Sequence, residues 1–459
     1  LYTNNTSCLI ELDKDYINLF KNFRLWAKKY YFCRKFSSMD EKIKMVERYN
    51  FWNNDVPVGY IRKSYIEKIW NYLGNKLIKV LIGQRRVGKS YIMRQLASNL
   101  ISNGVKSENI LMINKEFESF SFIETHNDLD KFISAYENKF KPQGKIYILI
   151  DEVQEIEGWE KAINSYSQDY SKDYELFISG SNSKMLSSEL SSLLSGRYIE
   201  FKIFPFSYDE YCLVNNVENS RQTYLEYIKT GGFPELINLN GDETKRNYVS
   251  ALKDTILLKD IIQRHQIKDV KLLEDIFVYL VNNASNLISI TSIVNWFKSK
   301  GRKTSYDTVA NYIEYIGNAY LIHKAERYNI KGKEIISGNY KFYVNDLSFK
   351  NFLYKGFGYG TGYILENVVY LELLRHGYDV YVGNIKDKEV DFVAFKDDNV
   401  IYIQSTYMLI DEQTITREYS VLKSINDNYR KIIVSLDDIK MPSQDGIEHV
   451  LAWELSSCL

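Results

Sequence analysis

Two glycines, a lysine and a serine stand at a spacing that is typical of phosphate binding. Gly83 is followed by four residues and then by Gly88, Lys89 and Ser90. The glycines let the backbone bring N–H groups close to a polyphosphate, and the following helix adds its positive dipole end. Lys89 would bind the β- and γ-phosphates and Ser90 a magnesium ion. The pattern predicts a P-loop for ATP and Mg²⁺, formed by Gly83, Gln84, Arg85, Arg86, Val87, Gly88, Lys89, Ser90 and Tyr91.

The residues on both sides of this loop give it the context that the motif requires. Residues 80–82 are an apolar run that predicts a buried strand, and residues 90–96 have the pattern of a helix. The alternative is a glycine-containing turn that binds nothing. We favour phosphate binding because Lys89 and Ser90 complete the motif.

A second group of chemical residues follows a later strand. Residues 146–150 are apolar and lead into Asp151 and Glu152. Asp151 is predicted to hold magnesium through its water shell, and Glu152 to polarise the attacking water. Many buried strands end in acidic residues, so this interpretation depends on the P-loop upstream. With it, Lys89 and Glu152 are the predicted catalytic residues.

Two further positions are candidates near the phosphates. The predicted strand 175–179 runs into Asn182, and parallel strands end at one edge of a sheet, so Asn182 is expected beside the γ-phosphate. Capping of a helix by this segment is an equal alternative. Arg197 could stabilise phosphoryl charge as an arginine finger, in cis or from a neighbouring subunit, or it could form a structural salt bridge.

The composition narrows the class of protein. The 459 residues suggest about three domains. Lys and Arg total 59, as do Asp and Glu, so net charge gives no argument for nucleic acid or an anionic membrane. Four scattered cysteines and five dispersed histidines indicate a reducing compartment without a zinc site. We expect a cytoplasmic protein without a membrane span, since no apolar run of about 18 residues or signal pattern is present.

The order of patterns predicts five parts. These are a helical extension at 1–60, the nucleotide-binding core at 61–204, a helical lid at 205–268, a winged helix at 269–340 and an α/β domain at 341–459. The winged helix is inferred from three helical patterns followed by an extended segment. DNA phosphates could contact the basic turn before its third helix, although such turns are often only solvated; its residues are Lys298, Lys300, Arg302 and Lys303.

The last domain carries an incomplete set of metal ligands. Glu366 on a predicted helix and Asp391 and Gln404 on predicted strands have the spacing of the magnesium site in a restriction-type nuclease. Residues 403–406 supply neither the acid nor the lysine that such a site needs. We therefore favour a degenerate domain that is structural or docks nucleic acid, and keep an active nuclease as the alternative.

Several motifs together resemble one family. GQRRVGKS, LIDEVQEIEGWEKAI, FPFSYDEY and GGFP are similar to prokaryotic AAA+-type P-loop ATPases of the archaeal-ATPase and STAND-related clade. The segments KFYVNDLSFKN, GYILENVVYLELLRHGYDVYVG and KEVDFVA resemble the domain of unknown function that accompanies them, which is similar to restriction-endonuclease folds. The resemblance implies an α/β protein with a parallel-sheet AAA+ core, ATP binding and slow hydrolysis, and contact of Pro234 with the base or sugar.

Three functions are consistent with these patterns. The leading one is a magnesium-dependent ATPase that couples its nucleotide state to DNA or to a protein partner, which could be a second copy. The first alternative is a nucleotide-dependent switch with little turnover and no DNA. The second is an ATP-regulated nuclease.

Overall fold

The computed structural model of the chain describes residues 38–181, 194, 196–354 and 361–459. Most of the predicted extension at 1–60 lies outside the described residues. From residue 38 the chain forms the short helix α2 (Met39–Val46), which begins with a capping box between Ser38 and Glu41. Among the described residues, no helix is long and apolar enough to cross a membrane.

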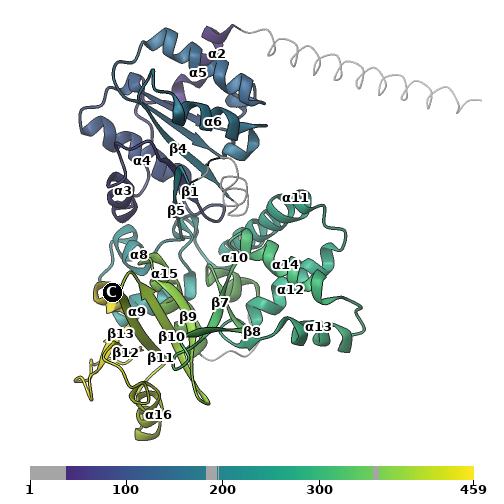
Figure 1. Cartoon of the computed structure of the whole chain (residues 1–459), viewed down its shortest axis with the longest axis vertical. Coiled ribbons are helices and arrows are strands. Elements are labelled where there is room, and N and C mark those ends of the chain that lie inside the picture. Colours follow the sequence, from purple (N-terminus) through teal and green to yellow (C-terminus); the bar gives the residue numbers. More distant parts are fainter. Residues whose placement is uncertain (1–37, 182–193, 195, 355–360) are drawn as a thin grey trace, which may run out of the picture.

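A five-stranded parallel sheet forms the first half of the molecule, at the top of Figure 1. Its spatial order is β2-β3-β4-β1-β5. The strands are β1 (Ile78–Ile82), β2 (Ile110–Asn114), β3 (Ile146–Asp151), β4 (Tyr174–Gly180) and β5 (Tyr198–Lys202). Parallel strands all end at the same edge, so the residues after β1, β3 and β4 are brought together there.

Helices cover both faces of this sheet. Leu81 of β1 packs in the same core as α3 (Lys63–Trp70) and α4 (Lys89–Ser102). Its neighbours Val80 and Ile82 pack in a second core with α5 (His126–Phe140) and α6 (Trp159–Gln168). Adjacent side chains of a strand point to opposite faces, so β1 is buried on both, and its one charged residue, Lys79, pairs with the buried Glu175 of β4. This α/β core with a parallel sheet agrees with the predicted fold class.

A group of helices, which corresponds to the segment predicted as a lid and is called the lid below, follows the sheet. It contains α8 (Tyr208–Asn215), α9 (Arg221–Thr230), η5 (Pro234–Asn238), α10 (Asp242–Thr255), the π-helix η6 (Ile256–Ile262) and α11 (Gln263–His265). Gly231 ends α9 with φ +87°, a backbone conformation that residues other than glycine rarely adopt. The chain therefore leaves the helix α9 at Gly231.

The next elements alternate helices with a short strand and end in a hairpin. They are α12 (Val270–Asn282), β6 (Leu287–Ile288), α13 (Ile290–Ser299), α14 (Tyr306–Asn318), β7 (Ile322–Asn329) and β8 (Glu334–Val344). Both β6 and β7 pair antiparallel with β8. The three helices project to the right in Figure 1.

The C-terminal part adds strands to the same hairpin. β9 (Asp379–Ile385) pairs parallel with β7, and the complete second sheet has the order β13-β12-β11-β10-β9-β7-β8-β6. Its other strands are β10 (Lys388–Lys396), β11 (Asn399–Thr406), β12 (Arg430–Ser435) and β13 (Ile447–Leu451), and its helices are η7 (Phe349–Leu353), α15 (Thr361–Arg375), α16 (Glu412–Lys423) and α17 (Leu455–Cys458).

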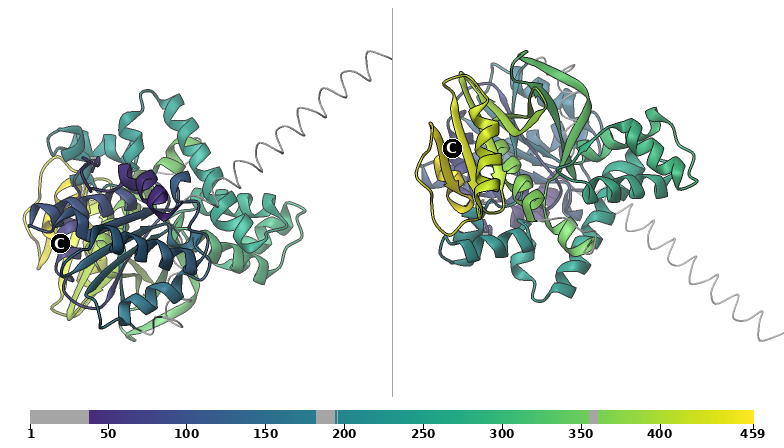
Figure 2. Two further views of the ribbon diagram at one scale, coloured as in Figure 1. Left: turned by 90° about the horizontal axis from the view of Figure 1, so that it is seen from above. Right: turned by 90° about the horizontal axis from the view of Figure 1, so that it is seen from below.

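This mixed sheet differs from the predicted division at residues 340 and 341. That boundary falls inside β8, and the hairpin of β7 and β8 belongs to the same sheet as β9 to β13. A single hydrophobic core also continues from α4 through the lid helices to α15 and β11. Figure 2 shows the helical group and the C-terminal sheet packed directly against each other. The nucleotide-binding core, the lid helices and the C-terminal sheet are therefore packed against one another.

Candidate nucleotide-binding site

The predicted P-loop connects the end of β1 to the start of α4. Gly83 has φ +150°, and a Cβ atom there would lie 2.2 Å from the carbonyl oxygen of Ile203. Gly88 has φ +98° and caps the amino end of α4. Arg86 also adopts positive φ, at +66°, although it is not glycine. The loop therefore needs its glycines where the backbone turns and where it passes close to the chain after β5.

Lys89 is the first residue of α4 and lies inside the loop. Its side chain is 4% exposed, and its Nζ donates to the carbonyl oxygens of Gly83 at 3.0 Å and Gln84 at 3.1 Å. The same ammonium is 3.9 Å from Oε1 of Glu152. Lys89 and Glu152 thus meet at the carboxyl edge of the sheet, as the sequence predicts for a site of phosphate chemistry.

Asp151 and Glu152 follow β3 at this edge, and both are buried. Burial raises the pKa of Asp151 and the neighbouring charge of Glu152 adds to this, while hydrogen bonds from Ser179 and Ser90 oppose it. Asn114 at the end of β2 donates to Asp151 Oδ2 at 2.8 Å. The hydroxyl of Ser179, near the end of β4, accepts from the backbone N–H of Glu152 at 3.1 Å. Three neighbouring strands therefore fix the two acids.

The residues at this edge fit a magnesium ion. The Ser90 hydroxyl hydrogen-bonds the Asp151 carboxylate, so two oxygen donors lie together. Both also line a cavity of about 280 Å³. Magnesium prefers oxygen ligands and keeps several waters, and a cation here would compensate two adjacent buried carboxylates. Ser90 and Asp151 are the residues that would hold it.

Arg85 binds the lid. Its guanidinium makes a two-pronged contact with Asp260 of η6, with Nε 2.9 Å from Oδ2 and Nη2 2.9 Å from Oδ1, and contacts Glu116 at 3.3 Å. Ser181, just after β4, donates to Asp260 at 3.4 Å. Burial raises the pKa of Asp260, and its hydrogen bonds with Arg85 oppose this. Sequence reasoning missed Asp260, since nothing in its local pattern distinguishes it from a solvated helix residue.

A second arginine, Arg62, contacts both the P-loop and the helix α8. Arg62, immediately before α3, is 2% exposed and donates through Nη1 to the carbonyl oxygens of Val87 and Phe204, both at 2.9 Å. Its Nη2 forms an ion pair with Glu210 of α8 at 2.6 Å. Arg62 therefore connects the P-loop to the lid as well. It lies outside the motif, so the spacing of motif residues does not reveal it.

Arg197 lies at the opposite edge of the sheet. Its carbonyl oxygen accepts from the N–H of Ile78 at 2.9 Å, and β5 pairs in parallel with β1 from that point. Five strand residues, or roughly 16 Å, separate Ile78 from the P-loop. An arginine side chain does not span this distance, so the predicted action in cis at this P-loop is wrong. Action on a neighbouring copy stays a prediction.

Two other predicted contacts have different outcomes. Asn182 lies outside the described residues. Pro234 is the first residue of η5. The backbone N–H of Gly232 donates to Asp346 in the C-terminal part at 2.7 Å. The carbonyl oxygen of Gly232 accepts from the N–H of Phe206 at 2.7 Å. The expected contact of Pro234 with a base or sugar therefore stays a prediction.

Comparison with known proteins decides the family. The model of an AAA domain family matches residues 75–212, and that of a domain of unknown function matches residues 221–358. An uncharacterised protein of Haemophilus influenzae is 35% identical over 400 residues, covering 86% of this chain and 98% of that protein. The chain belongs to the AAA-type P-loop ATPase family.

Two further relatives span much of this AAA-family chain. An uncharacterised protein of Methanocaldococcus jannaschii is 30% identical over 397 residues, which cover 82% of this chain and 86% of that protein. Among solved structures, the Walker-type ATPase of Pyrococcus abyssi is 16% identical with a TM-score of 0.41, covering 63% of this chain and 94% of that one. The matches to the two uncharacterised proteins therefore extend well beyond the P-loop domain.

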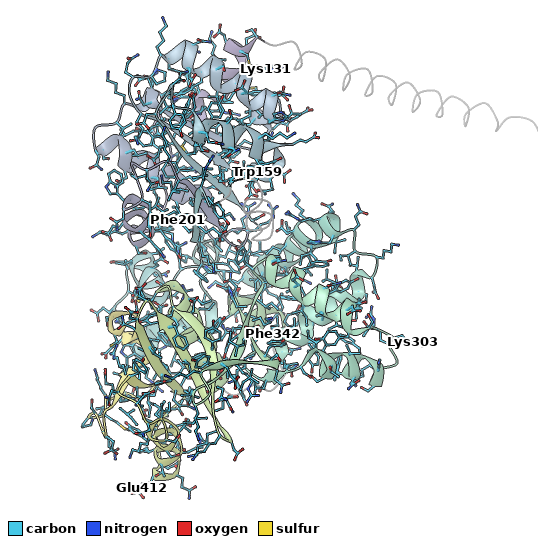
Figure 3. The ribbon with its side chains drawn as sticks, in the orientation of Figure 1. Lys131, Trp159, Phe201, Lys303, Phe342 and Glu412 are labelled. Carbon is cyan, nitrogen blue, oxygen red and sulfur yellow. The ribbon has the colours of Figure 1, made fainter. Side chains whose placement is uncertain are left out.

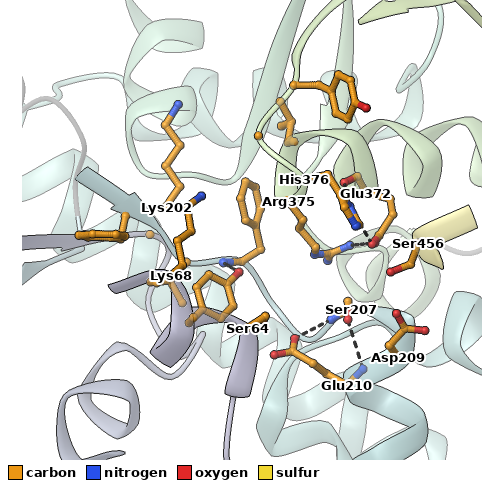
Figure 4. A pocket seen from close by; sticks show the side chains of 18 of the residues that line it. Ser64, Lys68, Lys202, Ser207, Asp209, Glu210, Glu372, Arg375, His376 and Ser456 are labelled. Atoms are coloured by element: carbon orange, nitrogen blue, oxygen red, sulfur yellow. Dashed lines mark hydrogen bonds and ion pairs between the residues drawn. The ribbon is translucent and has the colours of Figure 1, made fainter. Parts of the chain in front are cut away.

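A cleft separates the AAA core from the C-terminal sheet. It has a volume of about 800 Å³, and its walls come from α3, β5, α8 and α15. Figure 4 shows Lys68 and Lys202 on one side and the contacts of Glu372 with Arg375 and His376 on the other. Gly83 of the P-loop also lines this cleft. The back of the nucleotide loop is thus close to the C-terminal part.

The predicted nuclease-like residues converge around a lysine. Lys341 of β8 is 4% exposed, and its Nζ is 2.8 Å from Glu366 Oε1 and 2.7 Å from Glu389 Oε1. The backbone N–H of Asp391 donates to Gln404 at 3.2 Å, and Asp391 Oδ2 accepts from the N–H and hydroxyl of Ser405, both at 2.8 Å. Sequence reasoning noted the missing lysine on β11 and did not anticipate one from β8.

The ammonium of Lys341 changes what this centre can do. It lies between carboxylates that a nuclease would use to bind metal, and within the described residues no group of three or more acidic, His or Cys side chains could hold an ion. Lys341 therefore supplies from β8 the lysine that residues 403–406 lack, and its ammonium compensates the acids. The centre is better described as a buried charge cluster in which one cation is shared by several acids.

Glu366 should make the stability of the ATPase depend on pH. Burial raises its pKa to about 8, partly offset by Lys341, whereas in the unfolded chain the pKa is about 4.3. The folded state therefore binds the proton more tightly, and this contribution, complete at low pH, is lost as pH rises towards about 8. Glu366→Gln should flatten the decrease in melting temperature between about pH 5 and 8. An unchanged slope would contradict this assignment.

Proposed function

We propose that the chain is a magnesium-dependent ATPase. The observation that carries the proposal is the convergence of Lys89, Ser90, Asp151 and Glu152 at one sheet edge, with Ser90 hydrogen-bonded to Asp151 and Glu152 beside Lys89. Lys89 and the N–H groups of the loop would bind the β- and γ-phosphates. Glu152 would accept the proton of the attacking water. A bound Mg²⁺ supplies charge compensation on the phosphates.

The experiment that tests this proposal measures phosphate release from ATP by the full chain in the presence of Mg²⁺. Lys89→Ala is the matched variant, because it removes the ammonium and keeps a residue that favours helix at the start of α4. Release that depends on Mg²⁺ and disappears in Lys89→Ala supports the assignment. Equal release by both proteins would overturn it. Tightly bound ATP with negligible release would favour the nucleotide-dependent switch.

We also infer that the segment from α12 to β8 is a winged helix that contacts DNA. Three features support this. The order α12, β6, α13, α14, β7, β8, with β6 and β7 flanking β8, provides the three helices and the strand pair on which the prediction depends. Lys298, Lys300 and Lys303 are exposed before α14. Lys303 is at the outer end of this part, away from the AAA core (Figure 3).

Arg302 is excluded from the proposed DNA contacts. Its guanidinium pairs with Asp269 at 2.7 Å and also with Asp275, both from the region of α12. It fixes the basic turn against α12. This leaves three lysines of the four predicted basic residues available for phosphate groups.

Reversing these three charges should weaken DNA binding in a salt-dependent way. In Lys298→Glu/Lys300→Glu/Lys303→Glu, the slope of log affinity against log salt should fall by about 3, since each lost phosphate contact removes about 0.9. Fluorescence anisotropy with a duplex of mixed sequence measures this slope. The control is Lys139→Glu/Lys141→Glu/Lys161→Glu, which changes net charge equally with exposed lysines of the AAA core. Equal losses in both variants would refute a specific contact by the winged helix.

A further inference from the structure

A chain of hydrogen bonds joins the P-loop to the C-terminal sheet. Asn345, directly after β8, donates through Nδ2 to Oε1 of Gln84 at 2.6 Å. On its other side, Asn345 Oδ1 is 2.8 Å from Nε2 of His323 in β7. Gln84 is 0% exposed and Asn345 is 2% exposed. The contact is therefore buried and connects residues 261 positions apart in the sequence.

The direction of these hydrogen bonds follows from the orientation of the Asn345 amide. Burial lowers the pKa of His323 to about 4, opposed by its hydrogen bond with Asn345, so the ring is neutral near pH 7. The carbonyl oxygen of Asn345 can only accept, so Nε2 of His323 carries the hydrogen and donates. The amide nitrogen of Asn345 then faces Gln84 as a donor. Asn345 is thus held in one orientation from the C-terminal side.

Gln84 also contacts Lys89 through its backbone carbonyl oxygen. The ammonium of Lys89 binds the carbonyl oxygens of Gly83 and Gln84, at 3.0 and 3.1 Å. A phosphate group that reaches Lys89 competes with these carbonyls, so binding changes the hydrogen bonds of the Gln84 backbone. Because the Gln84 side chain is tied to Asn345, a shift in the loop changes that contact too.

Gln84 also has an unused hydrogen-bond donor. Its Nε2 is buried and has no partner among the described residues, and such a group is energetically unfavourable. Asn345 and His323 also line the cleft of about 800 Å³, so the C-terminal side of the contact is not closed by packing. The contact between Gln84 and Asn345 therefore has an unsatisfied donor on one side and a cleft on the other.

We propose that the contact between Gln84 and Asn345 transmits nucleotide occupancy of the P-loop to the C-terminal sheet. The inference rests on the proposed function, since it requires nucleotide binding. Asp346, the next residue, accepts from Gly232 of the lid at 2.7 Å. The end of β8 thus contacts both the P-loop and the lid. Coupling between sites is reciprocal, so a ligand of the C-terminal sheet alters nucleotide affinity through the same contact.

Hydrogen exchange of the full chain, with and without ATP and Mg²⁺, tests the coupling. In the wild type, ATP should change the exchange rate of amides in β8 and the adjacent part of α15 by roughly 5- to 150-fold, the usual range of coupling between sites. In Asn345→Ala, which leaves every residue of the P-loop in place, the change should be less than about twofold while ATP still binds.

Asn351→Ala is the matched control. Asn351 also joins the C-terminal part to the lid through its amide, which donates to the carbonyl oxygens of Ile228 at 2.7 Å and Lys229 at 3.1 Å without contacting the P-loop. It should keep the ATP-dependent change. The proposal is overturned if Asn345→Ala responds to ATP as the wild type does, or if Asn351→Ala loses the response equally. Failure of the wild type to bind ATP would instead refute the proposed function.

Discussion

ATP turnover by Glu152→Gln should be about 10² to 10⁴-fold lower than that of the wild type, the usual contribution of a general base. Glutamine has the same shape as glutamate and accepts a proton far less readily. The backbone N–H of Glu152 would still donate to Ser179, and Asp151 would keep its bonds with Asn114 and Ser90. The variant should therefore bind ATP and fail to hydrolyse it.

Single-turnover phosphate release, together with the affinity for ATP, separates this effect from a loss of binding. Glu155→Gln is the control, because Glu155 is an exposed acid three residues further along the same segment. It should retain wild-type turnover. Lys89→Ala should lose affinity as well as turnover, since Lys89 would contact the phosphates. If Glu152→Gln turned over within a fewfold of the wild type, another group would have to be the base.

The AAA-type ATPase family and the α/β fold could be predicted because their signals are local. The P-loop spacing and the apolar strands are each contained in a short window, and the apolar run at 146–150 lies within β3. Contacts between distant segments have no such signal. Asp260 and Asn345 are an acid in a helix and an amide after a strand. Their roles arise only when Arg85 and Gln84 are brought against them.

Arg197 was expected near the phosphates because the sequence does not reveal the strand β5 that follows it. Residues 198–202 mix apolar and charged side chains, and only Phe201 of β5 is buried. The segment therefore lacks the continuous apolar run that indicates a central strand. Once β5 is paired with β1, the parallel register puts Arg197 at the beginning of the strands. Recognition of the strand from the sequence would have moved this arginine away from the phosphates.

The same limit applies to the C-terminal charge centre. The sequence gives the spacing of Glu366, Asp391 and Gln404, and the structure brings these residues together. The sequence does not indicate that Lys341 enters the centre, because Lys341 lies at the predicted boundary between two domains. Only the pairing of β8 within the large sheet directs this lysine towards the acids.

Removing that lysine should destabilise the C-terminal sheet strongly. Lys341→Met conserves much of the side-chain volume and, at a pH above about 8 where Glu366 is ionised, leaves Glu366 and Asp391 buried without their cation, which costs about 3–5 kcal/mol. Urea denaturation followed by hydrogen exchange of β8 to β11 measures the loss locally, as a chain of several parts need not unfold in one step. Lys388→Met on β10 is the control, because Lys388 is exposed and should change stability by less than about 0.5 kcal/mol.

The double variant Lys341→Met/Glu366→Gln identifies the cause of that loss. If uncompensated charge is responsible, replacing Glu366 by a neutral residue of the same shape should recover part of the stability, since the remaining buried acid, Asp391, keeps its bonds from Ser405. If Lys341 contributes mainly through packing, the double variant should be no more stable than Lys341→Met. Recovery would establish that this lysine serves the nuclease-like centre as its resident cation.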